Sequence, residues 1–152
     1  MAQGLILRRM QMRHALSLMA LTTMLVACGE VAVSLTTDAT EYQPGDTVQL
    51  VLQNEGTRKV GYNLCTVRME RQEDSGWVYT PHLGENEACQ LMQHTLKGGA
   101  QAQGTLLLPA ALPTGEYRIV HDVDTLRTDS QGQTDREPVT SNTFHVGEEG
   151  TP

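Results

Sequence analysis

From residue 31 onward, apolar residues recur at every second position in short runs separated by turn signals. Residues 48–53, VQLVLQ, alternate in this way, which predicts a half-buried β-strand. Residues 60–64, VGYNL, predict the next strand. The apolar parity changes at Cys65, and a one-residue shift turns side chains to the other face of a sheet. We therefore expect a bulge or a bend at Cys65.

The same pattern continues to the C-terminus, without any stretch of helical length and period. Together with 48–53 and 60–64, the expected strands are residues 31–35, 67–69, 77–79, 105–108, 117–123 and 139–146. Residues 73–76 predict a hairpin loop. Residues 124–137 are polar and acidic, with no hydrophobic period beyond Leu126, so we expect a solvated loop there. About seven short antiparallel strands at this spacing predict an all-β sandwich over residues 31–147, with a frayed end at 148–152.

The first 27 residues have a different composition. Three arginines precede the 13-residue apolar segment 15–27, ALSLMALTTMLVA, and no acid occurs before Ala27. A membrane-spanning helix needs roughly 20 apolar residues, so this segment is too short to span. A basic region followed by a short apolar region is typical of a cleaved secretory signal peptide.

The segment ends Leu25-Val26-Ala27-Cys28, which resembles the lipobox of bacterial lipoproteins. The resemblance implies that Cys28 is lipidated, becomes the mature N-terminus and anchors the chain in a lipid bilayer. Residues 28–30 would then form the lipidated cysteine and a short tether. Residue 29 is Gly rather than Asp, which resembles the signal for transport to the outer membrane in enteric-type bacteria. We therefore expect an exported protein that is anchored to a membrane by lipid. If the host is Gram-negative, we expect it on the outer membrane, facing the periplasm.

Two cysteines remain after Cys28. Export places Cys65 and Cys89 in an oxidising compartment, where an even pair indicates a disulfide. The alternatives are a redox pair, which usually has two residues between its cysteines, and a zinc site, which needs about four ligands. Neither pattern is present, so the spacing favours a structural disulfide.

Four short motifs carry a further resemblance. They are L-x-x-D-x-x-x-Y-x-P-G-D over residues 35–46, GYNLC over 61–65, PTGEY over 113–117 and SNTFHV over 141–146. In this order they resemble a bacterial Ig-like domain family found in small exported lipoproteins. The resemblance implies an Ig-like β-sandwich over about residues 31–147, in which Tyr117 bonds back across the corner that precedes its strand. It implies no reaction, because function depends on sites that a fold carries.

Charge excludes one class of partner. Residues 28–152 contain all 18 acids and 8 of the 11 basic residues, a net charge of −10. Such a domain repels phosphate backbones, so we expect no nucleic-acid partner.

Candidate chemistry is sparse. His121 with Asp122 and Asp124 could be a base with its orienting acid, but the nearest hydroxyl, Ser130, lacks the setting of a nucleophile. We therefore predict no enzyme activity and no catalytic residue.

Metal ligands are equally scattered. Met69, Met92 and His94 could be soft copper ligands only if the fold brought them together, and His82 and His145 lie in unrelated segments. The acidic residues of the 122–135 region fit no compact calcium loop. We expect no metal and no cofactor, and we expect Trp77 to pack in a hairpin.

The sequence thus predicts a membrane-anchored, extracytoplasmic Ig-like module with a non-enzymatic binding, scaffold or envelope-interaction role. Its expected partner is an unidentified envelope or extracellular protein. The alternative is a proteinase inhibitor, since loops at the end of an Ig-like sandwich can block active sites; a metal carrier or an enzyme is a weaker alternative.

Overall fold

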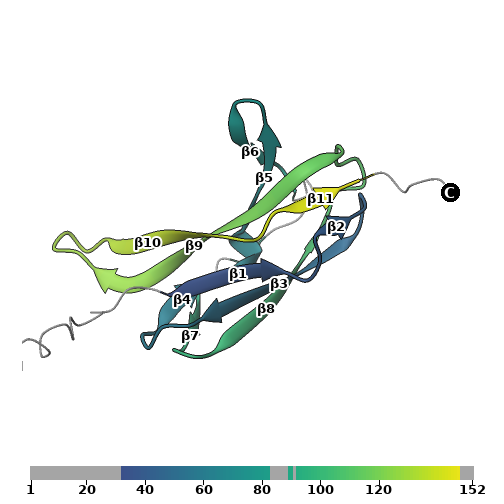
Figure 1. Ribbon diagram of the computed structural model, residues 1–152. Coiled ribbons are helices and arrows are strands. Elements are labelled where there is room, and N and C mark those ends of the chain that lie inside the picture. The colour runs from purple at the N-terminus through teal and green to yellow at the C-terminus, as the bar shows by residue number, and fades with distance from the viewer. Residues whose placement is uncertain (1–31, 83–88, 91, 148–152) are drawn as a thin grey trace, which may run out of the picture.

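The computed structural model describes residues 32–82, 89–90 and 92–147 (Figure 1). The predicted signal peptide, Cys28 with its tether, and the frayed end at 148–152 lie outside the described residues, as does most of the irregular segment 83–88. The strands are β1 (Val33–Thr37), β2 (Glu41–Tyr42), β3 (Thr47–Asn54), β4 (Val60–Tyr62), β5 (Arg68–Glu73), β6 (Gly76–Thr80), β7 (His94–Leu96), β8 (Gln101–Leu107), β9 (Gly115–Thr128), β10 (Thr134–Thr140) and β11 (Phe144–Val146). A 3₁₀ turn, η1 (Leu64–Thr66), joins β4 to β5.

Two sheets form the sandwich. The smaller has the order β1-β3-β8, and both of its strand pairs are antiparallel. The larger is built on β9, which pairs with β10 and β11 along one edge and with β4 and β5 along the other. The predicted all-β sandwich is confirmed. The described residues contain eleven strands rather than about seven, and the β2–β11 pair is parallel.

The core lies between the sheets, where the alternating residues meet. Val48, Leu50 and Leu52 of β3 are fully buried, and their polar neighbours face outward. Opposite them lie Tyr117 and Ile119 of β9, which are also fully buried. Removing these apolar surfaces from water is the main force that holds the two sheets together.

Cys65 lies in η1, where the sequence predicts a bend. The turn interrupts the strand after Tyr62, and buried side chains resume at Val67 and Met69. The change of apolar parity therefore marks a real break between β4 and β5. No transmembrane-length apolar helix occurs in the described ranges.

The prediction of a solvated loop at 124–137 is wrong. β9 continues to Thr128 and returns as β10, so that these residues form most of a hairpin arm that extends beyond the sandwich body (Figure 1). The far part of the arm is exposed on both faces. When both faces of a two-stranded ribbon lie in water, apolar and polar residues need not alternate along its strands. Hydrophobic periodicity therefore cannot reveal such strands in the sequence.

The predicted closing strand at 139–146 is divided, and the first strand is shifted. Ser141 interrupts the ladder between β10 and β11, because its hydroxyl accepts a hydrogen bond from the N–H of Ile119 at 2.9 Å. The N–H of Ser141 donates to the Ile119 carbonyl at 2.8 Å. β1 covers Val33–Thr37, in register with Asn54–Leu50 of β3, and so ends two residues beyond the predicted strand at 31–35, whose first residue lies outside the described residues.

Candidate functional site

His121 is the most buried ionisable side chain in the candidate catalytic group, with 1% of its surface exposed. Its Nε2 accepts a hydrogen bond from the N–H of Asn63 at 3.4 Å, so the imidazole is neutral and carries its proton on Nδ1. Burial lowers the pKa of His121, and nearby Arg68 adds to this, while Asp122 opposes it. Within the described part of the chain, Nδ1 has no hydrogen-bond partner.

The two acids do not orient His121. Consecutive strand residues face opposite sides of the sheet, and Asp122 pairs with Arg68 instead. The Arg68 guanidinium holds the pKa of Asp122 below its ordinary value. Asp124 accepts hydrogen bonds from the Gln93 side chain at 2.8 Å and from the N–H of Leu126 at 2.7 Å. The structure therefore places these three residues in separate structural roles.

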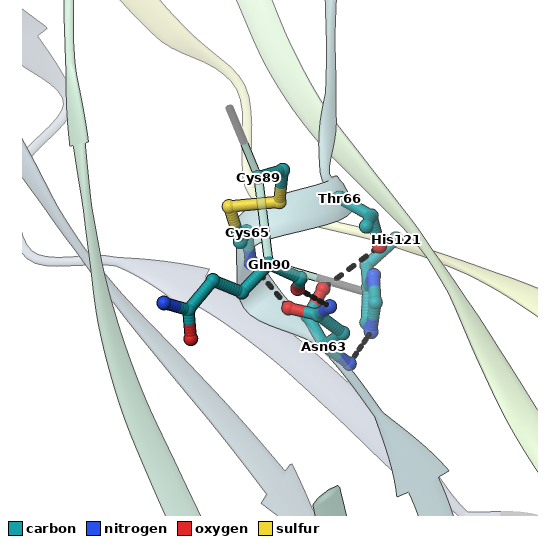
Figure 2. The surroundings of a disulfide bond; sticks show 6 residues. All are labelled: Asn63, Cys65, Thr66, Cys89, Gln90 and His121. Atoms are coloured by element: carbon teal, nitrogen blue, oxygen red, sulfur yellow. Dashed lines mark hydrogen bonds between the residues drawn. A yellow bond between two sulfur atoms is a disulfide. The ribbon is translucent and has the colours of Figure 1, made fainter. Parts of the chain in front are cut away.

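The Cys65–Cys89 disulfide predicted from the sequence is present, with a Cα–Cα distance of 5.6 Å. Asn63 reinforces it (Figure 2): its Oδ1 accepts from the N–H of Cys65 at 3.0 Å, and its Nδ2 donates to the Gln90 carbonyl at 2.7 Å. Asn63 thus connects η1, the segment after Cys89 and the buried His121 of β9. Sequence reasoning missed Asn63; its signal was an Asn directly before a short turn, a position that favours side-chain capping.

The candidate metal ligands do not converge. Met69 is fully buried in the core, Met92 is 57% exposed, and His94 packs against the Tyr62 ring at 5.5 Å between centroids. Residues 32–82, 89–90 and 92–147 contain no group of three or more His, Cys, Asp or Glu residues that could hold a metal ion. Asp129 turns the tip of the arm, because its Oδ1 accepts from the N–H groups of Gln131 and Gln133 at 2.8 Å.

Trp77 packs in the β5–β6 hairpin, as expected. The guanidinium of Arg118 lies 4.3 Å from the centre of the indole ring. Glu70 holds that guanidinium through an ion pair with an N–O distance of 2.7 Å. Arg118 on β9 therefore stacks on the indole and fixes the hairpin against the larger sheet.

The opening motif at 35–46 has a structural purpose. Asp38 accepts hydrogen bonds from the Tyr42 hydroxyl at 2.6 Å and from the N–H of Gln49 at 2.8 Å, and these bonds lower its pKa. Asp46 closes the Pro-Gly turn by accepting from the N–H of Gln43 at 2.7 Å. Asp38 and Asp46 therefore fix the entry to β3.

The smaller sheet presents a surface of another kind. β1, β3 and β8 contain no Asp, Glu, Lys or Arg. Their outward-facing positions form cross-strand rows, for example Ser34–Gln53–Gln101 and Thr36–Val51–Gln103. Neighbouring positions in a row are about 4.8 Å apart and successive rows about 7 Å. The result is a grid of amide, hydroxyl and apolar groups, named here the uncharged face, which ends at Ser34, where the hydroxyl donates a hydrogen bond to the Glu55 carboxylate at 3.2 Å. Its members are Ser34, Thr36, Thr47, Gln49, Val51, Gln53, Gln101, Gln103, Thr105 and Leu107.

The corner before β9 carries the bond expected from the PTGEY motif. The Tyr117 hydroxyl donates to the Pro113 carbonyl at 2.6 Å, and the ring is fully buried. A tyrosine that bonds back a few residues upstream in this way is a hallmark of Ig-like sandwiches. The family comparison agrees, since residues 29–137 match the bacterial Ig-like domain family. The chain belongs to that family.

The other comparisons carry no argument about this chain. No protein of curated function matches this bacterial Ig-like chain. Among solved structures, a Bordetella pertussis protein assigned as ApaA is 16% identical with a TM-score of 0.45, covering 80% of this chain and 96% of that one. The ASH/PapD-like domain 7 of human CEP192 is 18% identical with a TM-score of 0.40, covering 88% and 97%.

Proposed function

We propose that this protein is a non-enzymatic interaction module, anchored by lipid on Cys28 outside the cytoplasm, that binds an envelope protein through the uncharged face. The observation that carries the proposal is the complete absence of charge from β1, β3 and β8 in a chain with 18 acidic and 11 basic residues.

The chemistry of this face selects a type of partner. Amide and hydroxyl groups can each donate and accept, so they pair with an uncharged polar protein surface. Covering them costs less free energy than covering ionised side chains, which lose much more hydration on burial. The backbone ladders hold the rows at fixed spacing, so less conformational entropy is lost on binding than for a mobile loop.

Anchoring rests on the sequence of the signal segment and on the short tether. Only Gly29 and Glu30 would separate the lipidated Cys28 from residue 31. Two or three extended residues reach about 7–10 Å, so the domain would lie close to its bilayer. Cys28→Ser should abolish incorporation of labelled palmitate and release the protein from membranes. If the unaltered protein takes up no palmitate and fractionates as soluble, the anchor is wrong, while the binding face remains testable.

The binding face is tested by a photo-crosslinking residue at Gln103, an exposed position in the middle of β8. We expect one discrete protein adduct in cells, and we expect Gln49→Lys on the neighbouring strand to reduce it. The matched control is the same crosslinker at Glu137, exposed on β10 of the other sheet. Absence of an adduct at Gln103, or the same adduct from both positions, would contradict the proposal.

A further inference from the structure

Within residues 32–82, 89–90 and 92–147, β6 is an edge strand with no second partner. Among the described strands it pairs only with β5, and the β5–β6 hairpin projects from the sandwich (Figure 1). Its sequence, GWVYT, has no charge, and Val78 and Tyr79 are 38% and 56% exposed. Natural proteins usually protect such an edge with a lysine, a proline or a bulge, because its free backbone groups pair readily with another strand.

The hairpin register determines which backbone groups of β6 are free. The loop has two residues, with Glu73 opposite Gly76, and this flanking pair exchanges both hydrogen bonds in such a turn. Bonded and non-bonded pairs then alternate along the ladder. Val78, opposite Arg71, therefore bonds to β5, whereas Trp77 and Tyr79 direct their N–H and C=O groups away from it.

We propose that β6 pairs antiparallel with β6 of a second copy of this chain, about a two-fold axis that passes beside Val78. In this register Trp77 of each copy lies opposite Tyr79 of the other. Compared with other two-fold registers, this one uses all the outward N–H and C=O groups of Trp77 and Tyr79. The two copies then share four hydrogen bonds. The two larger sheets would become one continuous sheet through the dimer, and the pairing closes at two copies.

The side chains suit this occupant. Trp77 and Tyr79 lie on one face of β6, so the dimer brings four aromatic rings into cross-strand neighbourhood, an arrangement that stabilises paired strands. Arg118 already holds Trp77 in place. Val78 meets Val78 of the second copy on the opposite face. No like charges meet within the paired strands, and the repulsion between two acidic domains is largely screened beyond about 8 Å at physiological salt.

The test is a disulfide across the axis, in the full chain. Val78→Cys places two thiols at a directly opposed, non-bonded pair, where Cβ atoms lie about 4.5–5.5 Å apart. We expect a covalent dimer on a non-reducing gel after mild oxidation. Asp74→Cys, in the exposed hairpin loop, is the matched control: its two copies would lie more than about 20 Å apart, so it reports random collisions only.

A second substitution separates pairing from chance contact. Tyr79→Pro in the Val78→Cys chain removes an outward N–H from each copy but none that bonds to β5, so the fold should survive. Loss of two of the four hydrogen bonds should weaken the dimer about tenfold or more. Tyr79→Lys should weaken it as well. Crosslinking of Val78→Cys at the Asp74→Cys level, no effect of either Tyr79 substitution, or ladders of higher oligomers would overturn the proposal, and none of these outcomes depends on the uncharged face.

Discussion

At the scale of single residues, two buried side chains of β9 bond to backbone groups outside that strand. The Tyr117 hydroxyl closes the corner at Pro113, and His121 accepts from the backbone of Asn63. Both lie on β9, the strand that most of the larger sheet pairs with. The hydrogen bonds of Tyr117 and His121 therefore hold the fold together.

Tyr117→Phe tests the corner. The substitution removes one hydroxyl and leaves the Pro113 carbonyl without its partner, so the free energy of unfolding should fall by about 1–2 kcal/mol. Urea denaturation followed by tryptophan fluorescence measures it. Tyr79→Phe, at an exposed hydroxyl, is the control and should change stability by less than about 0.5 kcal/mol. Equal losses in the two variants would show that the corner bond contributes nothing.

His121 makes stability depend on pH. Burial lowers its pKa in the folded state, whereas the unfolded chain titrates near about 6.5. Below that pH the unfolded state binds more protons, so the free energy of unfolding should fall as pH drops from 7 toward 5. The carboxylates of Asp122 and Asp38, whose pKa values are lowered, lose their contribution only below about pH 4.

The measurement is urea denaturation at several pH values. His121→Gln should flatten the dependence between pH 7 and 5. His94→Gln, at an exposed imidazole, should leave it unchanged. A slope that persists in His121→Gln would assign it to another group.

At the scale of elements, β9 is a single strand with two environments. Its first half crosses the core, and its second half forms the exposed arm with β10. The change occurs at a bulge, where three residues of β9 face one of β10 between the pairs Asp124–Arg136 and Thr128–Thr134. Leu126 lies in this bulge with φ of 55°, the left-handed region, and 44% of it is exposed.

The bulge predicts an unusual response to glycine. Glycine in a normal strand costs about 0.5–1 kcal/mol, but it adopts a left-handed φ without steric penalty. Leu107→Gly, at an exposed residue of β8, should therefore destabilise the protein, while Leu126→Gly should cost less or stabilise it. Thermal denaturation of both variants measures the difference. A larger loss for Leu126→Gly would mean that its side chain, and not its backbone angle, matters.

At the scale of the whole molecule, the disulfide joins two segments that lie far apart along the chain. It spans a sequence separation of 24 residues, from η1 to the segment before β7. Cys65→Ala with Cys89→Ala should leave the sandwich folded but less stable by about 2–4 kcal/mol. Circular dichroism checks that the sandwich is folded, and urea denaturation measures the loss of stability. Thiol labelling of the unaltered chain, isolated without reductant, should find neither Cys65 nor Cys89 free; two reactive thiols would contradict the disulfide and the proposed oxidising compartment.

The strand pattern and the short motifs determined the class of fold, the core strand β3 and the pairing of Cys65 with Cys89. The fold class and β3 depend on local alternation and turn residues, which are properties of neighbouring residues. The pairing of Cys65 with Cys89 depends on there being only two cysteines after Cys28. The bend at Cys65 was predictable from local alternation as well, because a change of apolar parity along the chain indicates that the strand is interrupted.

Only the tertiary structure decided the rest. The far part of the arm formed by β9 and β10 has no buried face to give it a period, and the hydrogen bond between Asn63 and His121 joins residues 58 apart in sequence. The uncharged face appears when β1, β3 and β8 align, and the open edge of β6 follows from which strands find partners. Each of these depends on contacts between distant segments, and local sequence carries no record of which strand lies beside which.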